Sequence, residues 1–405
     1  MMRILQINAS YKPAYIYGGP TMSVGKLCEE VGGQGSEDRG QRSEVRGQRL
    51  EDRGWKSYTL LEVYTTLANG KEEFNYPSGA TQLVEGVKVR YFKRWTKDHS
   101  HFSPALLWHL WNNVKKFDVV HIHAWWNLVS VLSCWIAVIK GVPVLLTPRG
   151  TLSPYSFINS HALYKRIFHF LLGKPILKKV HFHLTSEKES VDTQKLFRGK
   201  SFRVIPNFVQ LSEKQAEHVS FETRPLQLIF LSRIDHKKGL ELLFESLSHL
   251  NFPFNISIAG AGEGDYVEGL KLQAKNLKIE QHIKWLGSIY GEEKFKLLAQ
   301  HHLLVLPSYD ENFANVVIES LSVGTPVLLS KQVGLADYVK QQQLGLVCER
   351  NIEDFRKAII ELENNRSSLA ELSKRSRSQI KKDFNADLLR NEYLELYQNI
   401  INESL

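Results

Sequence analysis

Short apolar runs alternate with amphipathic segments along most of the chain. The runs are rich in Val, Ile, Leu and Phe, which predicts strands buried on both faces, and the segments between them carry apolar residues at helical spacing. A first series of predicted strands comprises Ile4–Ile7, Leu61–Tyr64, Val87–Phe92, Val119–His123, Val142–Thr147 and Lys179–Thr185. A second series comprises Phe202–Pro206, Leu226–Leu231, Phe254–Ala259, Ile283–Leu286, Leu303–Pro307, Pro326–Ser330 and Gly345–Cys348. Helices predicted beside the second series are Leu240–Leu250, Tyr266–Asn276, Glu292–Gln300, Asn315–Val323 and Asp354–Asn364.

This alternation predicts an α/β fold with parallel sheets, and the two series predict two doubly wound, Rossmann-like domains facing across a cleft. We place the first domain at residues 1–205 and the second at residues 206–385, because a polar stretch follows the strand pattern there. Residues 386–405 predict a helix with one apolar side, which we expect to cross back to the first domain. A chain of 405 residues is a natural length for two domains.

Residues 32–54 break the alternation. They contain the units SEDRGQR, SEVRGQR and LEDRG at a seven-residue period, with no apolar stripe. Such a segment has little to bury, so we interpret it as a solvated insertion between a helix and a strand. An arm that binds an acidic partner is the alternative.

Three widely separated cysteines and the absence of a CxxC motif favour a reducing compartment over a disulfide framework or a zinc site. The opening MMRILQINAS has too short an apolar run for a signal peptide and predicts a buried strand. The longest apolar run, Leu128–Ile139, is too short to span a bilayer and predicts a core helix. We therefore expect a cytoplasmic protein.

The formal charge of +9 is concentrated in the N-terminal half. Residues 1–205 hold 29 lysines and arginines against 16 acidic residues, a charge of +13, and the remainder carries −4. This asymmetry favours an anionic partner, such as a membrane surface at its inner face or a phosphate-bearing acceptor. The segment YKRIFHFLLGKPILKKVHFHL (164–184) mixes cations with apolar residues as interfacial segments do, although a core helix and a strand explain its apolar positions equally.

Ligands of open α/β sheets bind beyond the carboxyl ends of the strands, so the strand-to-helix junctions are the places to search. Gly18 and Gly19 precede the first predicted helix, where glycine lets a phosphate approach, although an ordinary turn explains the pair too. In HIHAWW, alternation places His121 and His123 on one side of a strand, with His123 at its end. Arg149 lies at the end of the next strand, where a guanidinium can meet a phosphate or carboxylate.

In the second domain, Arg233 and Lys238 follow the first strand in SRIDHKKG. Two cations beyond a strand end can clamp a diphosphate and neutralise a leaving group, and a basic loop without a ligand is the alternative. The loop AGAGEGD carries Gly260, Gly262 and Gly264, but Asp265 stands at the third glycine of GxGxxG. A nicotinamide or flavin site is therefore poorly supported.

The stretch ENFANVVIE holds two acidic residues, Glu311 and Glu319. With a helix starting at Ala314 or Asn315, Glu311 lies in the preceding loop and Glu319 about one turn inside the helix, so both can flank its N-terminus. Amides there can hold a phosphate, and carboxylates suit the vicinal hydroxyls of a sugar or ribose. Because a helix dipole favours a carboxylate near its start, a purely structural role for one of them is the alternative.

The sequence resembles the retaining glycosyltransferases of family four (glycosyl transferases group 1), which have the GT-B architecture. The likeness rests on Glu311 and Glu319 in E-x7-E, on SLSVGTPVLLS, SRIDHKKG and YGGP, and on VVHIHAWW, and it covers nearly the whole chain outside the insertion. It implies transfer of a hexose from a UDP- or GDP-sugar to a hydroxyl of a glycan or lipid-linked acceptor. Retention of configuration, no metal or other cofactor, and a role in cell-surface polysaccharide synthesis are also implied.

The resemblance assigns roles residue by residue. Arg233 and Lys238 correspond to the diphosphate clamp, and Glu319 to the acceptor of the ribose hydroxyls. Glu311 corresponds to the residue that holds the transferred sugar. The implied donor contacts are the amides of Asn312, Phe313, Ala314, Asn315 and Val316, together with Gly18, Gly19 and Gly262.

The sequence departs from the family pattern at two places. The family commonly has glycines where this chain has Asn312 and Ala314, which leaves sugar preference open. The family often has a histidine where this chain has Arg149, so the contact of that position with the reacting sugar is open too.

Three other functions fit parts of the sequence. A nucleotide-sugar epimerase of the same architecture would also cleave at a diphosphate. A catalytically inactive sugar-binding partner would be favoured by loss of the cations or the glutamates, but this sequence has both. A nucleic-acid-binding protein is suggested by the basic half, but the sequence has no RNP-like aromatic pattern, zinc spacing or helix-turn-helix, so we expect no nucleic-acid partner.

Overall fold

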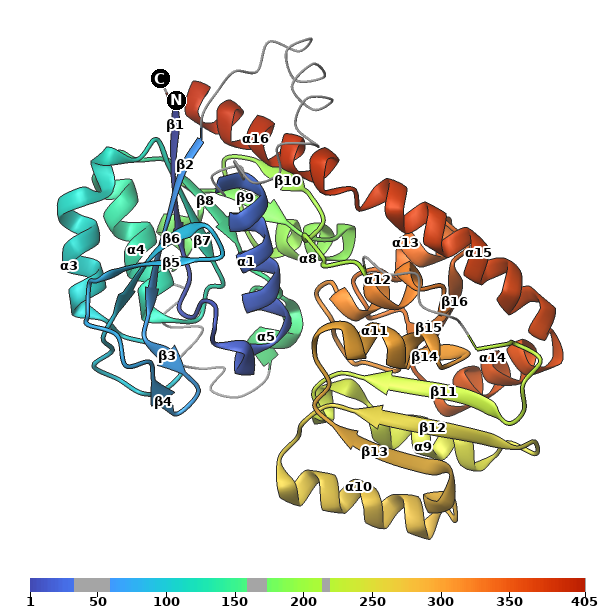
Figure 1. The fold of residues 1–405 in the computed structure, drawn as a ribbon. Helices are drawn as coiled ribbons and strands as arrows, with labels where there is room; N and C mark the ends of the chain where they lie inside the picture. The colour runs from blue at the N-terminus through green and yellow to red at the C-terminus, as the bar shows by residue number, and fades with distance from the viewer. Residues whose placement is uncertain (33–58, 159–172, 213–218, 405) are drawn as a thin grey trace. The chain divides into compact units, whose positions relative to one another are not determined.

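The computed structural model describes residues 1–32, 59–158, 173–212 and 219–404. They form two compact units, each with its own sheet (Figure 1). The first unit contains Met1–Phe208 and Ala386–Leu405, and the second contains Val209–Asn385. The sequence pattern put this boundary after residue 205. Most of the low-complexity insertion lies outside the described residues.

The first unit is built on an eight-stranded sheet in the order β10-β9-β8-β7-β1-β2-β6-β5. All neighbours are parallel except β5 and β6. The strands are β1 (Met2–Ile7), β2 (Thr59–Thr66), β5 (Thr81–Val84), β6 (Val87–Phe92), β7 (Val119–His123), β8 (Val144–Thr147), β9 (His181–Leu184) and β10 (Phe202–Val204). Every apolar run of the predicted first series is therefore a strand of this sheet, as a parallel sheet covered on both faces requires.

One strand of the predicted second series belongs to the first sheet instead. Strand β10 pairs in parallel with β9, with Phe202 opposite Phe182, and the two rings stack with centroids 5.0 Å apart. The sequence pattern gives no sign of this pairing, because both sheets use apolar runs of the same kind.

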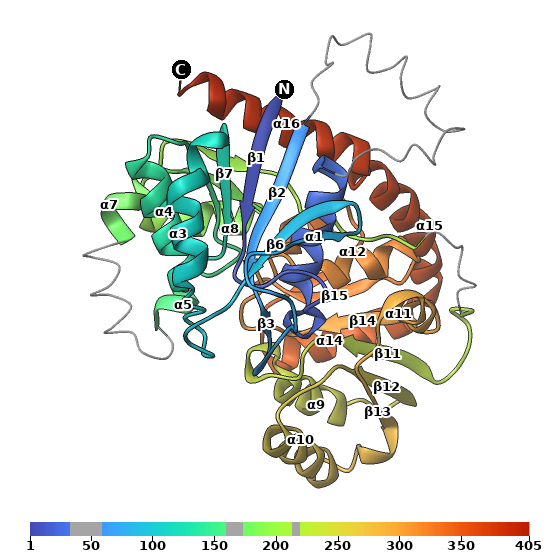
Figure 2. The ribbon, with the colours of Figure 1, turned by 60° about the vertical axis from the view of Figure 1, so that its left-hand side comes forward.

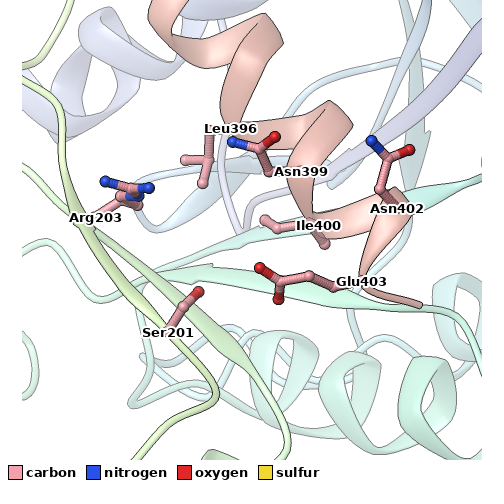
Figure 3. A pocket seen from close by; sticks show the side chains of 7 residues that line it. All are labelled: Ser201, Arg203, Leu396, Asn399, Ile400, Asn402 and Glu403. Carbon is pink, nitrogen blue, oxygen red and sulfur yellow. The ribbon is translucent and has the colours of Figure 1, made fainter.

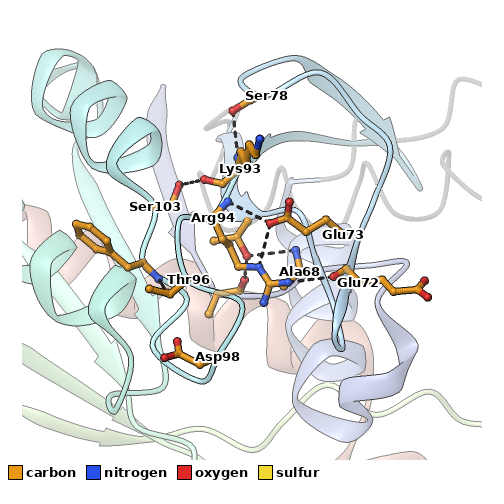
Figure 4. A network of polar contacts seen from close by, with 12 residues as sticks. Ala68, Glu72, Glu73, Ser78, Lys93, Arg94, Thr96, Asp98 and Ser103 are labelled. Carbon is orange, nitrogen blue, oxygen red and sulfur yellow. Dashed lines mark hydrogen bonds and ion pairs between the residues drawn. The ribbon is translucent and has the colours of Figure 1, made fainter.

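Residues 68–84 contain strands that the pattern did not predict. Strand β5 joins β6 through Glu85 and Gly86, whose φ angles of 48° and 81° are those of a two-residue hairpin turn. A second hairpin pairs β3 (Ala68–Asn69) with β4 (Glu72–Glu73). The buried Arg94 fixes this hairpin, since its Nε donates to Glu73 at 3.2 Å and its Nη2 donates to the Glu72 carbonyl at 3.0 Å (Figure 4).

Helices cover both faces of the first sheet. They are α1 (Gly19–Gly32), α3 (Pro104–Asn113), α4 (Leu128–Ile139), α5 (Pro154–Ile158), α7 (Lys174–Leu177), α8 (Glu187–Leu196) and α16 (Ala386–Asn402). Figure 2 shows α3 and α4 side by side on one face. On the other face α16 packs against α1, and its Leu389, Tyr393 and Ile400 enter the same core as Ile4 and Val24.

The second unit has a six-stranded parallel sheet in the order β13-β12-β11-β14-β15-β16. Its strands are β11 (Leu226–Leu231), β12 (Phe254–Ala259), β13 (Ile283–Gly287), β14 (Leu303–Leu306), β15 (Val327–Ser330) and β16 (Gly345–Cys348). Its helices are α9 (Leu240–Ser248), α10 (Gly264–Asn276), α11 (Gly291–Ala299), α12 (Asn315–Ser322), α13 (Ala336–Gln341), α14 (Ile352–Asn364) and α15 (Arg366–Asp383). The predicted strands and helices of this unit are confirmed, and both units are doubly wound α/β structures.

Within the described residues, no helix combines the length and apolar character that crossing a bilayer requires. The run Leu128–Ile139 is helix α4, as the sequence predicted.

Candidate functional site

In the second unit, the loop after β11 meets the loop after β14. The Asp235 carboxylate accepts a hydrogen bond from the Lys237 amide at 2.8 Å, and the Tyr309 amide donates to the Lys237 carbonyl at 2.8 Å. Gly239 then adopts φ 72°, and a Cβ there would lie 2.4 Å from the Pro307 carbonyl oxygen. Only glycine lets the two loops approach this closely.

Two consecutive ion pairs join these loops. Lys238, which is buried, pairs with Glu311, and its neighbour Lys237 pairs with Asp310 at 3.0 Å. The structure therefore brings together one predicted cation and one predicted carboxylate at the carboxyl edge of the sheet. The Glu311 amide donates to the Gln332 carbonyl at 3.1 Å, which holds Glu311 beside the end of β15.

Helix α12 begins at Asn315, as predicted, directly after Ala314. Ala314 has φ 69°, in the left-handed region, and no side chain caps the helix. Phe313 is buried in the core of the second unit, where it meets the Phe384 ring edge-on. The segment from Asn312 to Val316 is thus anchored by Phe313, and the helix start, which no side chain caps, has the polarity to bind an anion.

Glu319 lies in the second turn of α12 and is almost completely buried. Its Oε1 is 2.6 Å from the Nζ of Lys294 on α11. Lys294 was not predicted, because in the sequence it resembles any surface lysine of an amphipathic helix. The structure therefore shows a second pair of a cation and a carboxylate, which joins α11 to α12.

Arg233 and Gly262 lie on neighbouring strand exits. Arg233 is exposed and has no hydrogen bond or ion pair with another described residue, so its guanidinium is available to a ligand. Gly262 packs against Ile234: a Cβ at Gly262 would lie 2.6 Å from the Ile234 carbonyl oxygen. The geometry explains this glycine by packing between the loops after β11 and β12.

In the first unit, Gly18 and Gly19 lead into α1. Gly18 has φ 67°, and Gly19 is exposed as the first residue of the helix. The Ser23 hydroxyl, one turn later, donates to the Pro20 carbonyl and accepts a hydrogen bond from Arg149 Nη1 at 2.9 Å. Arg149 at the end of β8 is thereby tied to the turn that follows the predicted phosphate loop.

Arg149 is held by three side chains. Besides Ser23, its Nη1 donates to Asn207 Oδ1 at 2.9 Å, and its Nε donates to His123 Nδ1 at 3.3 Å. Its φ of 53° is unusual for a residue with a side chain. The remaining terminal nitrogen, Nη2, has no hydrogen-bond partner among the described residues, so it is the atom that can meet a ligand.

His123 lies beneath Arg149 and is completely buried. Its Nδ1 accepts from Arg149, and its Nε2 bonds Gln6 Oε1 at 2.7 Å, so neither ring nitrogen is left for a substrate. The prediction that His123 faces a ligand is not supported by this geometry. The prediction that His121 and His123 lie on one side of the strand is confirmed, because their ring centroids are 4.2 Å apart.

Buried Glu189 supports the turn that carries Arg149. Its carboxylate accepts hydrogen bonds from the Gly150 amide at 2.7 Å and the Thr185 amide at 2.8 Å. Burial raises the pKa of Glu189, while these hydrogen bonds and the nearby Arg149 favour its charged form. Its negative charge compensates the partly buried guanidinium. Glu189 was not predicted, because it lies in the first turn of an ordinary-looking helix, α8.

A surface hollow of about 340 Å³ lies elsewhere on the first unit, between β10 and α16 (Figure 3). It is lined by Ser201, Arg203, Leu396, Asn399, Ile400, Asn402 and Glu403. Ser201 precedes β10, so the hollow lies toward the amino end of that strand, opposite to the edge where ligands of parallel sheets bind. We do not place the candidate site there. No group of metal-ligating side chains is found among the described residues.

Two family models match the chain. The one described as Glycosyltransferase Family 4 matches residues 47–213, and the one described as Glycosyl transferases group 1 matches residues 212–379. Glycogen synthase of Mycobacterium tuberculosis is 24% identical over 272 residues, which are 66% of this chain and 65% of that protein. The chain spans between 30% and 65% of the length of the first curated relatives it matches.

Solved structures resemble the whole chain. Sucrose-phosphate synthase from Thermosynechococcus elongatus has a TM-score of 0.74 at 17% identity, with all of both chains covered. HepE from Anabaena, in complex with UDP-glucose, has a TM-score of 0.69 at 17% identity, covering 98% of this chain and 100% of that chain. At these identities the likeness shows the fold.

Proposed function

Since this chain belongs to the family-four glycosyltransferases (glycosyl transferases group 1) and its two Rossmann-like units are those of the GT-B fold, we propose that it transfers a hexose from a nucleotide-sugar donor to a hydroxyl of a glycan or lipid-linked acceptor. We further propose that the transfer retains the anomeric configuration, needs no metal, and serves cell-surface polysaccharide synthesis.

The ion pair of Lys238 with Glu311 is the observation that carries the proposal. A buried lysine beside a carboxylate and the uncapped start of α12 form a place where an anion and a sugar can be held together. A donor diphosphate would take Lys238 as its partner, together with the exposed Arg233. Glu311 would then be left to accept hydrogen bonds from sugar hydroxyls.

In the proposed reaction the acceptor oxygen bonds to the anomeric carbon while the bond from that carbon to the diphosphate oxygen breaks. The bonding electrons leave with the nucleoside diphosphate, and the acceptor proton passes to a diphosphate oxygen. Lys238 and Arg233 stabilise the charge that develops on the leaving group, which is the role that a metal ion plays elsewhere. Glu319, now paired with Lys294, would bind the ribose hydroxyls.

We propose a UDP-sugar as the donor, with a GDP-sugar as the alternative, because HepE shares this fold and its structure contains UDP-glucose. UDP-glucose, UDP-galactose, GDP-mannose and ADP-glucose would be compared by thermal unfolding. At about 100 times its Kd, the true donor adds about 2.7 kcal/mol of stability, which raises the melting temperature of the second unit by roughly 5–10 °C.

Absence of a shift with every nucleotide sugar would contradict the proposal. The epimerase alternative is tested in the same samples, because an isomerised sugar formed from the donor alone would favour it over transfer.

We also propose that the first unit docks on an anionic membrane surface through the α3–α4 face, defined as Trp108, Trp111, Trp135, Ile136 and Ile139. Helix α4 contains no charged residue, and it buries small side chains such as Ser130 and Ser133 while leaving Trp135 and Ile136 partly exposed and Ile139 exposed. On neighbouring α3, Trp108 is 71% exposed. Exposed tryptophans suit the bilayer interface, where a ring is half in water.

Lysines border the α3–α4 face. Lys140 lies 3.8 Å from the centre of the Trp111 ring, Lys115 and Lys116 follow α3, and Lys174 is exposed on α7, which packs against α4. Each lysine near an anionic surface adds about 1 kcal/mol of attraction. The membrane-binding segment predicted from the sequence was residues 164–184, of which 164–172 lie outside the described residues.

The double variant Trp108→Ser/Trp111→Ser is expected to bind phosphatidylglycerol-containing vesicles about tenfold more weakly than the parent at low salt, because it removes the apolar anchors. Vesicle sedimentation measures the change. Leu272→Ser, which removes a side chain of α10 that is 60% exposed, is the matched control and should leave binding unchanged. Equal binding of all three proteins would refute the assignment of this face.

A further inference from the structure

A continuous chain of buried hydrogen bonds crosses the first unit. It runs from Arg149 through His123 to Gln6 on β1, then to Tyr397 on α16 and His121 on β7. From there it passes through Thr147 and His183 to the carbonyl of Ile205. After the Arg149 contact of 3.3 Å, its successive lengths are 2.7, 2.9, 2.8, 2.6, 2.7 and 2.9 Å.

The carbonyl at one end fixes the direction of every hydrogen bond. A carbonyl only accepts, so His183 carries its proton on Nε2 and its Nδ1 accepts from Thr147. The Thr147 oxygen then accepts from His121 Nε2. His121 Nδ1 accepts from Tyr397, whose oxygen accepts from the Gln6 amide.

The Arg149 guanidinium at the other end requires the same direction for the hydrogen bonds of His123 and Gln6. Arg149 Nε only donates, so His123 Nδ1 accepts and His123 carries its proton on Nε2, which donates to Gln6 Oε1. Gln6 must then present its NH₂ group to Tyr397, as the carbonyl end also requires. One arrangement of protons satisfies the whole chain.

Burial keeps the three histidines neutral, which this arrangement needs. It lowers the pKa of His183 to about 3 and holds the pKa values of His121 and His123 well below the usual range. A neutral imidazole has one donor and one acceptor, so the tautomer of each ring depends on its neighbour.

Tyr397 is the link that joins the two halves of this chain. Its hydroxyl is the acceptor for Gln6 and the donor for His121, and it comes from α16, near the far end of the sequence. Without that hydroxyl the Gln6 amide is free to rotate and donate to His123 Nε2. His123 would then carry its proton on Nδ1, where it opposes the Nε–H of Arg149.

We infer that Tyr397 is a positioning residue for Arg149: through Gln6 it holds His123 in the Nε2–H tautomer, and this ring orients the guanidinium so that Nη2 stays available to a ligand. The contact of Nη2 with the donor or the reacting sugar rests on the proposed function. The proton arrangement itself does not.

The test compares Tyr397→Phe with Tyr393→Phe in the full chain. Tyr393 lies one turn earlier on α16 and is equally buried. Its hydroxyl adds a 3.1 Å contact to His183 Nε2, which keeps its bond to Ile205 in either case. The two variants therefore lose the same atom from the same helix, and only Tyr397→Phe interrupts the chain.

Nitrogen-15 spectra of labelled histidine and arginine side chains read the outcome without any substrate. In the parent and in Tyr393→Phe, His121, His123 and His183 should be in the Nε2–H form, with a slowly exchanging Arg149 Nε–H. In Tyr397→Phe, His123 should become a tautomer mixture and the Arg149 Nε–H should exchange at least tenfold faster, whereas His121 should stay in the Nε2–H form, because Thr147 and His183 still fix it from the Ile205 end. An Nδ1–H or charged His123 in the parent, or identical spectra of the two variants, would overturn the inference.

Sugar transfer, measured once a donor is known, gives the second readout. Tyr397→Phe is expected to lower kcat at least tenfold with the donor KM unchanged, whereas Tyr393→Phe stays within twofold. If the spectra change as expected but kcat does not, the role of Arg149 in the reaction is wrong and the proton arrangement stands. If Tyr397→Phe does not fold, Gln6→Met interrupts the same chain beside His123 and is expected to give the same His123 spectrum.

Discussion

Replacing Lys238 by methionine is expected to slow sugar transfer by about 100- to 1000-fold, the usual loss when one donor that stabilises developing negative charge is removed. Methionine keeps the length and apolar stem of lysine, so the packing of the buried side chain next to Gly239 should survive. The lost ammonium group is the partner that we assign to the donor diphosphate. Initial rates at saturating donor measure the effect, and thermal unfolding confirms that the variant is folded.

Lys331→Met is the matched control for this experiment. Lys331 follows β15 in the same unit and also pairs with a glutamate, Glu349, but both side chains are more than half exposed. Exposed pairs contribute little to stability, and we assign Lys331 no contact with the donor. The rate of sugar transfer by Lys331→Met should stay within about twofold of the parent rate. A folded Lys238→Met protein that keeps more than a tenth of the parent rate would show that Lys238 is not the partner of the leaving group.

Gly260→Ala is expected to destabilise the second unit by roughly 3 kcal/mol or more, through overpacking and backbone strain. Gly260 has φ 150°, and a Cβ there would lie 1.8 Å from the carbonyl oxygen of Ser232. That atom is main chain at the exit of β11, so it has no easy way to move aside. The expected fall in melting temperature of the second unit is about 6–12 °C.

Gly264→Ala is the matched control for Gly260→Ala, because it adds a methyl group to the same segment without the close contact that Gly260→Ala would make. Gly264 is the first residue of α10, its φ is negative, and an added Cβ has no neighbour within 4 Å. The free energy of unfolding of Gly264→Ala should change by less than about 1 kcal/mol. We expect a small increase, because alanine restricts the unfolded chain more than glycine does. If calorimetry gave the two variants equal melting temperatures, the close approach of the loops after β11 and β12 would not be what Gly260 is needed for.

Two glycines of the loop AGAGEGD are explained by packing between adjacent loops and not by the sequence motif. Its spacing gave poor support to a dinucleotide fingerprint, and the sequence offered no other reason for its glycines. The structure supplies one, because Gly260 and Gly262 let neighbouring strand exits pass at main-chain contact distance. Such packing depends on which loops are adjacent, and that is set by the strand order rather than by the loop itself.

The fold was predictable where one residue type repeats along a segment. Runs such as Leu226–Leu231 and Leu303–Leu306 specify buried parallel strands on their own. The start of α12 at Asn315 is one of the two positions, Ala314 or Asn315, that the strand–loop–helix pattern predicted. The hairpin of β5 and β6 was missed although Glu85–Gly86 between alternating residues is a turn signal of the kind that asparagine–glycine gives.

The polar side chains of the candidate site were harder to predict, because their partners are distant in sequence. Lys294 pairs with Glu319 across two helices, and Gln6 is the single buried polar residue of strand β1. One signal was present: VVHIH and VHFHL both place histidines at alternate positions of a strand. Two such strands point to a buried polar layer, but only the fold shows that Tyr397 completes it.

The return of α16 to the first unit has a consequence for the order in which the molecule matures on the ribosome. The core of the first unit includes Leu389, Tyr393, Leu396 and Ile400, which are synthesised only after all of Val209–Asn385. The first unit therefore cannot complete its core until the second unit and then α16 have been synthesised. Until then, part of the apolar surface of the first unit stays uncovered. We expect holdase chaperones and proteases to bind the nascent chain chiefly at this uncovered apolar surface of the first unit.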